Sequence, residues 1–304
     1  MSHGLNHFAG RILGGRPRVL VLVALCCGAH AGVEAGEKAV PIYRSLPATK
    51  APTARDIVSL PDYRNGQAVA MRIGGRFAYL IKPRGRVDPS KRWIWIFPFE
   101  HALASVGGGI EHQFYVDAVL AKGFHVAGID IGVACGSPRA ADLCQRFYED
   151  LVATYGLNPR ARLLAQSNGG LNAYSWAVRH PDCVERIACL YPATDLRSWP
   201  GLAEAVVYPT RGLGFDLTQE QLAGRLAEFN PIENLQPLAK AQVKLLHLHG
   251  DQDKLVPLEA NSSELARRYR VLGGAAEIVV VRGYAHGGGP FTASKAVRGF
   301  LLAD

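Results

Sequence analysis

Residues 165–170 have the sequence Ala-Gln-Ser-Asn-Gly-Gly, and the fold prediction starts from this segment. It lies between an apolar run over 162–165, which predicts a strand, and a segment over 169–179 with helical spacing. Small residues two positions before and two after Ser167 relieve crowding in a sharp strand-to-helix turn. Ser167 is therefore the candidate nucleophile, and the backbone N–H of Asn168, at the start of the helix, is a candidate oxyanion donor. The alternative is an ordinary turn, in which Ser-Asn-Gly is common.

Outward from this turn, short apolar runs alternate with segments of helical spacing. Strands are predicted over 92–97, 124–131, 162–165, 186–191, 243–249 and 276–281, and helices over 111–122, 138–155, 169–179, 260–271 and 291–302. Strands that alternate with helices are typical of βαβ units and a mainly parallel sheet flanked by helices. Two further runs, 67–73 and 76–81, flank Gly74-Gly75 and predict a hairpin that adds antiparallel strands at one edge. The fold class is therefore α/β.

Residues 195–236 interrupt this alternation with prolines, short helical stretches and no clear strand. This composition predicts a small helical cap insertion over the sheet. Trp199, Tyr208 and Phe215 are candidates to line a site beneath the cap, and such a lining suits sugar rings, aryl groups and short acyl chains equally. Because large apolar side chains are mostly buried, we expect at least two of the three to form the cap core instead.

The loop over 249–257, with the sequence His-Gly-Asp-Gln-Asp-Lys-Leu-Val-Pro, comes directly after a predicted strand. An acid in such a loop orients a catalytic histidine and stabilises its cation. Asp253 is the favoured acid because it lies further into the loop, whereas Asp251 is suited to hydrogen-bond backbone N–H groups of the turn. The alternative is that both aspartates are turn residues.

The loop over 283–289, Gly-Tyr-Ala-His-Gly-Gly-Gly, follows the last predicted strand. A histidine among glycines has no packing role, so His286 is the candidate general base. The chain order Ser167, Asp253, His286 matches one known serine–acid–histidine arrangement. Each of the three patterns is weak alone, but three strand ends in this order together predict a catalytic triad.

With this triad and this strand pattern, the chain resembles the α/β-hydrolase superfamily from about Gln67 to its end. It is most similar to bacterial secreted serine esterases of the branch that holds dienelactone hydrolases and prolyl oligopeptidase catalytic domains. Three further segments, 195–200, 230–239 and 268–274, resemble a group of secreted bacterial hydrolases. The resemblance implies an acyl-enzyme formed on Ser167, with no metal and no organic cofactor.

The chain departs from the family pattern at two points. Ala165 takes the place of the usual glycine before the nucleophile, a small change that keeps the turn feasible. The strand over 92–97 is followed by Pro-Phe-Glu-His, although the family's second oxyanion donor comes from this loop and often from an HGGG-type motif. The backbone N–H of Phe99 is the first candidate for that donor and that of Glu100 the second. The glycines at 107–109 come too late for this role and predict a loop before the next helix.

The chain has 304 residues, 48% of them hydrophobic and 20% charged, a balance that excludes intrinsic disorder. Residues 1–31 combine three arginines, no acid, a short apolar run and Ala29-His30-Ala31, which is the pattern of a secretory signal peptide. The alternative, a membrane anchor, needs an apolar run of ~20 residues. We therefore expect a signal peptide over 1–31, an extended lead-in over 32–66, a hydrolase domain over 67–304, and a periplasmic or secreted protein without an integral membrane span after cleavage.

The formal net charge of +8 falls by three, to +5, when residues 1–31 are removed. The remaining positive residues are scattered and form no long basic run, so nucleic acid is not expected as a partner. Four cysteines remain after cleavage, at positions 135, 144, 183 and 189. Of the possible pairings we favour Cys135–Cys144, because the two flank a Gly-Ser-Pro turn, and the alternative is four buried thiols. The sequence contains no Cys-x-x-Cys pair, which is the spacing typical of a zinc site.

The sequence thus predicts a serine hydrolase that cleaves carboxylic esters. The expected substrate is a small-molecule or polysaccharide ester, such as an O-acyl group on a carbohydrate or a small aryl or acyl ester. The first alternative is a serine peptidase of the prolyl oligopeptidase type, and the second is a non-catalytic binding protein on a hydrolase fold. The oligomeric state is not predicted by any feature of the sequence.

Overall fold

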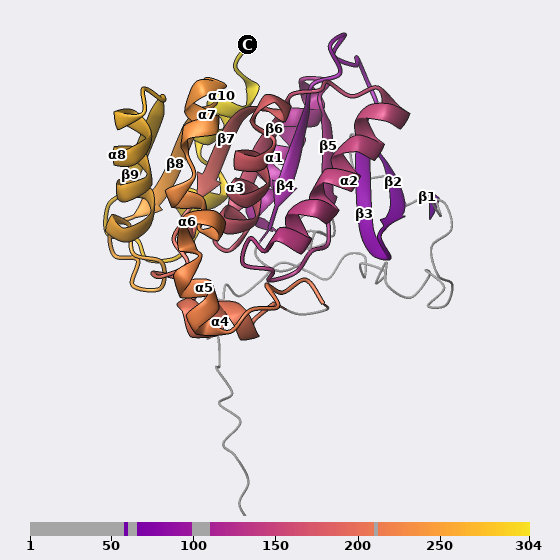
Figure 1. Cartoon of the computed structure of the whole chain (residues 1–304). Coiled ribbons are helices and arrows are strands. Elements are labelled where there is room, and N and C mark those ends of the chain that lie inside the picture. Colours follow the sequence, from indigo (N-terminus) through magenta and orange to yellow (C-terminus); the bar gives the residue numbers. More distant parts are fainter. Residues whose placement is uncertain (1–57, 60–65, 99–109, 210–211) are drawn as a thin grey trace, which may run out of the picture. The chain divides into compact units, whose positions relative to one another are not determined.

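The computed structural model describes residues 58–59, 66–98, 110–209 and 212–304, all within one unit of the chain (Figure 1). The predicted signal peptide over 1–31, the candidate donors Phe99 and Glu100, and the glycines at 107–109 lie outside the described residues. Most of the predicted lead-in also lies outside them. Its described part includes the short strand β1 (Val58–Ser59), which pairs with the hairpin.

The described residues form one nine-stranded sheet with the strand order β1-β2-β3-β5-β4-β6-β7-β8-β9. The strands after β1 are β2 (Gly66–Ile73), β3 (Arg76–Pro83), β4 (Trp93–Phe97), β5 (His125–Ile129), β6 (Ala161–Gln166), β7 (Val184–Leu190), β8 (Lys244–Gly250) and β9 (Ala276–Val281). The pairs from β1 to β3, and the pair β3–β5, are antiparallel, whereas all pairs from β5 to β9 are parallel. The predicted mainly parallel sheet with an antiparallel edge hairpin is therefore confirmed.

Helices cover both faces of this sheet (Figure 1). The helices outside the cap are α1 (Ile110–Ala121), α2 (Pro138–Tyr155), α3 (Gly169–Arg179), α7 (Gln236–Lys240), α8 (Glu264–Val271), α9 (Gly289–Thr292) and α10 (Lys295–Leu302). Buried residues of α2, α3, α7 and α8 share one cluster with the sheet, and α1 packs with α9 and α10. Adjacent parallel strands joined by helices thus place their carboxyl ends at one common edge.

Local sequence signals set several of these element boundaries. Helix α2 begins at Pro138 because the Ser137 side chain accepts the backbone N–H of Ala140, and it ends at Gly156 in the left-handed conformation (φ 63°). The hairpin turns on Gly74-Gly75, with φ of 55° and 77°. The predicted helix over 291–302 is split, because the side chain of Ser294 caps a new helix by accepting the N–H of Val297.

The core between the sheet and α2 and α3 is built on aromatic rings. Trp93, Trp95 and Phe97 alternate along β4 onto one face of the sheet, with ring centroids 5.8 and 4.7 Å apart. Trp176 of α3 packs against Trp95 at 4.7 Å, and Phe147 of α2 packs at 5.1 Å. All of these rings are buried, and each contributes roughly 1.5–3 kcal/mol by leaving water. This packing explains why β4 carries an aromatic ring at every second position.

The cap comprises α4 (Leu202–Val207), α5 (Gln219–Gly224), α6 (Leu226–Phe229) and a turn of 3₁₀ helix over Pro231–Glu233. The described parts of residues 195–236 contain no strand, as predicted. Trp199 and Phe215 are buried with other apolar cap residues, and Tyr208 packs against their cluster. The expectation that at least two of the three aromatic residues form cap core is confirmed.

The predicted Cys135–Cys144 disulfide is wrong, because all four described cysteines are free thiols. Cys144 lies inside α2 and packs in the main core, whereas Cys135 lies in the preceding loop (φ 50°) and packs with the cap cluster. The two cysteines flank a turn in the sequence, but their side chains pack in different clusters. Burial raises the pKa of Cys135 to about 12, so its thiol stays protonated at neutral pH.

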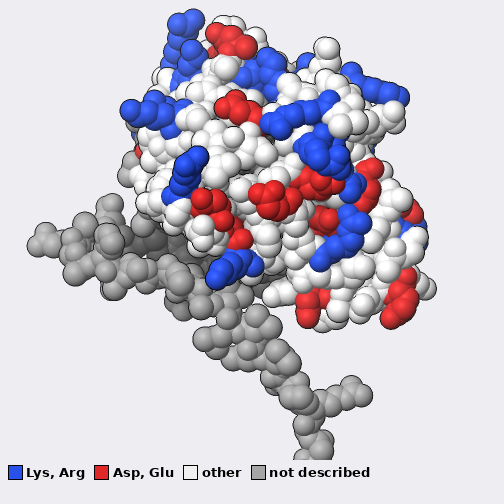
Figure 2. All heavy atoms as spheres, turned by 90° about the vertical axis from the view of Figure 1, so that its left-hand side faces the viewer, with Lys and Arg blue, Asp and Glu red and all other residues white. Residues whose placement is uncertain are grey.

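Charges of both signs are interspersed on the face that carries α8 and β9 (Figure 2). On α8, Glu264 accepts hydrogen bonds from Arg267 and Arg268 at 2.7 Å, and Arg268 also reaches Glu233 of the cap at 2.6 Å. Positive charge on this helix is thus matched locally by carboxylates. Among the described residues, no helix combines the length and the apolar character needed to cross a membrane.

Candidate active site

Ser167 follows the last residue of β6 and adopts a left-handed backbone conformation, with φ of 51°. Its N–H donates to the carbonyl of Leu190 at 3.0 Å, and its own carbonyl accepts the N–H groups of Gly170 and Ala193, both at 2.9 Å. These three hydrogen bonds hold a conformation that a serine rarely adopts. The turn presents the hydroxyl at the carboxyl edge of the sheet, as the sequence pattern predicts.

Close packing explains the two glycines that follow the serine. A Cβ atom on Gly169 would lie 2.0 Å from the carbonyl oxygen of Phe97, at the end of β4. A Cβ atom on Gly170 would lie 2.6 Å from the carbonyl oxygen of Ala193. The departure at Ala165 is accommodated, since its side chain is fully buried within β6. The elbow therefore depends on the absence of side chains after the serine.

The two aspartates after β8 have different partners. The Asp251 carboxylate accepts the backbone N–H of Gly283 at 2.7 Å and so ties the β8 loop to the β9 loop. Asp253 accepts the N–H groups of Leu255 and Val256 on Oδ1, at 3.0 and 2.9 Å. Its Oδ2 faces the imidazole of His286. The geometry therefore gives Asp251 a turn role and leaves Asp253 as the acid of the site.

His286 joins the acid to the serine. Its Nδ1 lies 2.7 Å from Asp253 Oδ2, and its Nε2 lies 2.8 Å from Ser167 Oγ. An ionised carboxylate only accepts hydrogen bonds, so Nδ1 carries the proton and Nε2 is left to accept the serine hydroxyl. The structure thus brings together the three residues that the sequence predicts, from three loops of the same sheet edge.

Hydrogen bonds keep the acid ionised. Burial raises the pKa of Asp253, but hydrogen bonds from His249, from His286 and from the backbone N–H of Val256 outweigh burial and hold the pKa well below its ordinary value. The Asp253 side chain is fully buried, whereas that of His286 is 18% exposed. The charge that orients His286 is therefore shielded from water, while the imidazole is partly exposed.

Comparison with known proteins agrees with this geometry. Residues 158–301, which contain all three candidate residues, match the sequence model of the Prolyl oligopeptidase family. No curated protein matches the chain. The chain therefore has the α/β-hydrolase fold, and the segment that carries the candidate triad is similar to the Prolyl oligopeptidase family.

Solved structures share the fold of this hydrolase at low sequence identity. A puromycin-hydrolyzing peptidase of Mycobacterium tuberculosis is 17% identical with a TM-score of 0.59, and the match covers 78% of this chain and 40% of that one. A putative dipeptidyl aminopeptidase IV of Bacteroides ovatus is 14% identical (TM-score 0.55; 82% and 34% covered). Dipeptidyl peptidase 4 of Porphyromonas gingivalis is also 14% identical (TM-score 0.54; 79% and 35% covered). The hydrolase thus spans less than half the length of these chains.

Tyr191 is a further residue of the site that the sequence patterns did not predict. Tyr191 follows β7, as Ser167 follows β6, and it too has a positive φ, of 38°. Its ring packs edge-on against His286 with centroids 4.5 Å apart, and its hydroxyl accepts a hydrogen bond from Gln166. The signal that could have found it is its place at the next strand end in the parallel sheet. Tyr191 therefore packs against the imidazole of the candidate base.

The oxyanion donors of the hydrolase stay a prediction. Asn168 is fully buried and stands at the N-terminus of the eleven-residue helix α3, where backbone N–H groups and the helix dipole favour negative charge. Phe97 and Pro98 lie beside the elbow, as the close approach of Gly169 shows. The predicted second donor, Phe99, lies outside the described residues.

The cap of the hydrolase packs directly on the loops of the triad. Leu171 on α3 and Val256 in the Asp253 loop share a buried cluster with Trp199 and Phe215 of the cap. Asn261 ties the start of the cap to the segment after the acid loop, because its Oδ1 accepts the N–H of Thr194 at 3.0 Å. The cap therefore supports the acid loop as well as bordering the site.

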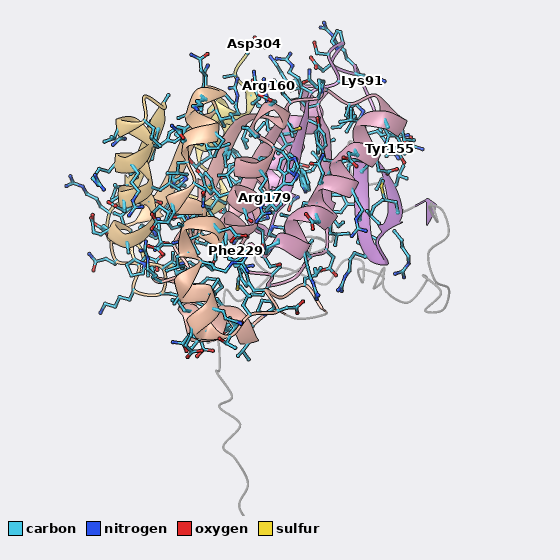
Figure 3. The ribbon with its side chains drawn as sticks, viewed as in Figure 1. Lys91, Tyr155, Arg160, Arg179, Phe229 and Asp304 are labelled. Carbon is cyan, nitrogen blue, oxygen red and sulfur yellow. The ribbon has the colours of Figure 1, made fainter. Side chains whose placement is uncertain are left out.

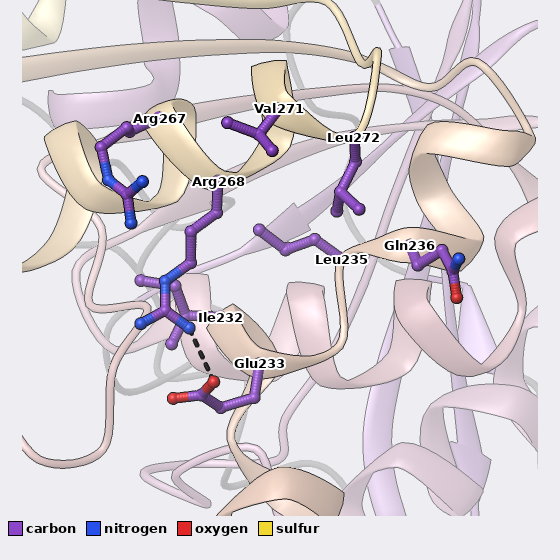
Figure 4. A pocket seen from close by; sticks show the side chains of 8 residues that line it. All are labelled: Ile232, Glu233, Leu235, Gln236, Arg267, Arg268, Val271 and Leu272. Atoms are coloured by element: carbon purple, nitrogen blue, oxygen red, sulfur yellow. Dashed lines mark hydrogen bonds and ion pairs between the residues drawn. The ribbon is translucent and has the colours of Figure 1, made fainter.

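A surface pocket of about 530 Å³ lies elsewhere, between α8 and the segment that ends the cap (Figure 4). Its lining consists of Ile232, Glu233, Leu235, Gln236, Arg267, Arg268, Val271 and Leu272. None of the three candidate catalytic residues contributes to it. Arg268 donates to Glu233 in this lining, so these two charges are paired. Among the described residues, a nucleophile, a base and an acid converge at the strand-end site and not in this pocket.

Proposed function

We propose that the hydrolase cleaves acyl compounds with Ser167 as nucleophile, His286 as general base and Asp253 as the acid that orients the base. The observation that carries this proposal is the unbroken hydrogen-bonded line from Ser167 Oγ through both nitrogens of His286 to Asp253 Oδ2, at 2.8 and 2.7 Å. Such a line raises the reactivity of a serine hydroxyl that is otherwise a weak nucleophile.

The reaction follows from the protonation states. His286 Nε2 takes the hydroxyl proton as Ser167 Oγ attacks the substrate carbonyl, and the resulting imidazolium is stabilised by Asp253. The oxyanion is held by the backbone N–H of Asn168 and by a second donor, proposed to be Phe99, and loss of one such donor costs roughly 3 kcal/mol of barrier. His286 returns the proton to the leaving group. Water activated by the same imidazole then hydrolyses the acyl-enzyme.

Carboxylic esters are the first substrate class of this proposal. An alkoxide leaving group departs more easily than an amine, so an ester demands less of the acid step than an amide does. The cap borders the site with a buried apolar cluster that contains Trp199 and Phe215. Small aryl or acyl esters, and O-acyl groups on carbohydrate, are the substrates to examine first.

Peptides are the second substrate class. The match of residues 158–301 to the Prolyl oligopeptidase family favours it, as does the similarity in fold to the three proteins above, which are named as peptidases. The same triad serves both classes, because both form an acyl-enzyme on the serine. What separates the classes is protonation of the leaving amine, and the binding of residues on either side of the scissile bond.

A matched pair of substrates separates the two classes. The p-nitrophenyl ester and the p-nitroanilide of the same acyl group are compared with wild type, with Ser167→Ala and with Ser263→Ala as a control outside the site. We expect ester turnover, a loss of at least about 10³-fold in Ser167→Ala, and no change in the control. Amide turnover within tenfold of ester turnover would favour the peptidase. A wild type that is inert towards both substrates and towards a fluorophosphonate probe would overturn the proposal.

A further inference from the structure

A chain of buried polar side chains continues behind Asp253, on the side away from the serine. His249 Nε2 lies 3.3 Å from Asp253 Oδ2, and His249 Nδ1 lies 2.7 Å from Ser262 Oγ. Ser262 Oγ also lies 2.9 Å from His247 Nδ1, and His247 Nε2 lies 2.7 Å from the hydroxyl of Tyr174. All four side chains are shielded from solvent, with exposures of 1% or less. The predicted triad thus has a buried extension that crosses from β8 to α3.

One backbone carbonyl sets the direction of every hydrogen bond in this chain. His249 Nε2 lies 2.8 Å from the carbonyl oxygen of Val256, which only accepts, so Nε2 carries the proton. In a neutral imidazole Nδ1 must then accept, and it accepts from the Ser262 hydroxyl. The Ser262 oxygen in turn accepts from His247 Nδ1, and His247 Nε2 accepts from Tyr174.

Neutral imidazoles suit this environment. Burial, with a smaller contribution from His249, lowers the pKa of His247 to about 3, so His247 carries no charge at neutral pH. With both rings neutral, each donor in the chain has one acceptor and no polar atom of the four side chains is left over. A fully satisfied buried network specifies one arrangement of its members.

This arrangement of His249 affects the Asp253 carboxylate. The N–H of His249 donates to the Val256 carbonyl at 2.8 Å, and the same Nε2 lies 3.3 Å from Asp253 Oδ2. Asp253 Oδ1 already accepts two backbone N–H groups, and Oδ2 accepts from His286. His249 therefore places a second, positively polarised N–H beside the oxygen that orients the catalytic imidazole.

We propose that His249, held in one tautomer by Ser262, His247 and Tyr174, is a positioning residue that fixes the Asp253 carboxylate against His286. This inference rests on the proposed function of the triad. His249 touches no reacting atom, and its effect passes through the carboxylate. Ser262 acts one step further out, because it prevents the His249 ring from turning its other nitrogen towards Asp253.

Two pairs of variants test this role in the full-length protein. His249→Gln keeps an amide N–H near the place of Nε2, whereas His249→Leu removes the donor at similar volume. Ser262→Ala breaks the chain, whereas Ser263→Ala changes the neighbouring serine, which makes no cap hydrogen bond. We expect kcat on a p-nitrophenyl ester to fall about 10- to 100-fold in His249→Leu and Ser262→Ala. We expect KM to stay within about twofold, His249→Gln to recover most of the loss, and Ser263→Ala to match wild type.

A spectroscopic measurement on the wild type does not depend on variants that fold. Nitrogen-15 NMR of the histidine rings is expected to show His249 protonated on Nε2 and bare on Nδ1, and His247 the reverse. The opposite tautomers, or a doubly protonated His249 at neutral pH, would overturn the inference. So would a folded His249→Leu with wild-type kcat.

Failure of this inference differs from failure of the proposed function. If wild type neither turns over the ester nor reacts with a fluorophosphonate, the triad proposal fails and the positioning role fails with it. If wild type reacts and His249→Leu reacts at the same rate, only the positioning role is lost.

Discussion

The two edges of the parallel sheet at which strands begin and end both bury polar side chains, but they do so in different ways. At the carboxyl edge lie the triad and the hydrogen-bonded chain of His249, Ser262 and His247. At the amino ends, Arg162 is 1% exposed and binds Glu185 through two hydrogen bonds of 2.7 and 2.9 Å. Figure 3 shows Arg160 and Asp304 at that second edge and Phe229 of the cap on the opposite side.

The edge at the amino ends of β6 and β7, which we call the ionic edge, uses charged side chains to hold elements together. Glu185 also accepts from Arg186, and the two arginines donate to the carbonyls of Leu301 and Phe300 at the end of α10. Burial raises the pKa of Glu185, but hydrogen bonds from Arg162 and Arg186 outweigh it and lower the pKa. The shared Glu185 and the backbone carbonyls of α10 thus give both buried arginines hydrogen-bond partners and tie β6, β7 and α10 together.

At the catalytic edge, the Asp253 carboxylate instead accepts hydrogen bonds from His286 and from backbone N–H groups, with His249 beside it. His286 Nε2 faces the serine hydroxyl. Buried polar groups thus hold elements together at one edge, whereas at the other they leave an acceptor facing a nucleophile.

The largest effect should come from changing the acid of the catalytic edge. In Asp253→Asn the amide can present an N–H to His286, which favours the wrong tautomer, and we expect kcat to fall by about 10⁴-fold. The measurement is ester turnover at neutral pH. Asp251→Asn is the matched control, because its side-chain oxygen can still accept the N–H of Gly283. Equal losses in both variants would contradict the assignment of the acid.

A change at the ionic edge should lower stability and leave activity unchanged. Glu185→Gln leaves Arg162 buried without its counter-charge, so we expect the free energy of unfolding to fall by about 3 kcal/mol. We expect kcat and KM to stay within about twofold of wild type at temperatures where the variant is folded. Urea unfolding and ester kinetics on the same sample make this test. A large loss of kcat in a stable Glu185→Gln protein would mean that the two edges are coupled.

The buried histidines predict how stability depends on pH. The folded pKa of His247 is about 3 and its ordinary value is 6.5, so below pH 6.5 the unfolded chain binds a proton that the folded one does not. Stability therefore falls as pH drops from 6.5 towards 3. Between pH 6.5 and 5.5 this one histidine costs about 1 kcal/mol.

Urea unfolding at pH 6.5 and 5.5 measures this dependence for wild type and for His247→Gln. The variant is expected to lose about 1 kcal/mol less than wild type over the same interval. His112 and His125, whose pKa values burial lowers to about 4, contribute in the same direction in both proteins. An identical pH dependence in the two proteins would show that His247 is not buried as a neutral ring.

The smallest effect belongs to an exposed ion pair on the cap. Arg225 and Glu228 are about half exposed and lie 2.7 Å apart, one helical turn from each other. Because water screens such pairs, we expect Glu228→Gln to change the free energy of unfolding by less than about 0.5 kcal/mol. Thermal or urea unfolding checks this value. A loss as large as that of Glu185→Gln would remove the distinction between buried and exposed charge.

Much of the sheet and the line of three site residues follow from local patterns. The alternation of apolar runs and helical segments predicts β4 to β9 in their observed order, and helices α2 and α3 have the predicted bounds. Ser167, Asp253 and His286 were found because each follows a strand, and parallel strands end at one edge. The sequence favours Asp253 over Asp251 as the acid because Asp253 lies further into the loop. In the structure the two carboxylates do bind different partners.

Other features depend on contacts between distant segments and left no local pattern. Cys135 and Cys144 are close in sequence but pack in different clusters. The helix predicted over 260–271 starts instead with a π-helical turn over Glu259–Ser263, in which Ser262 lies between two histidines of β8. Tyr191 contacts His286, which lies 95 positions later in the sequence.

Local sequence patterns are sufficient to predict the order of strands and helices, the strained turn at Ser167 and the loops that carry the acid and the histidine. These features depend on side-chain size and periodicity within short segments. The folded structure is needed to show which oxygen of Asp253 faces His286, which nitrogen of His249 carries a proton, and which cysteines stay apart. Those outcomes depend on distances of about 3 Å between groups far apart in the chain, and a hydrogen bond of that length exists only once the sheet has brought them together.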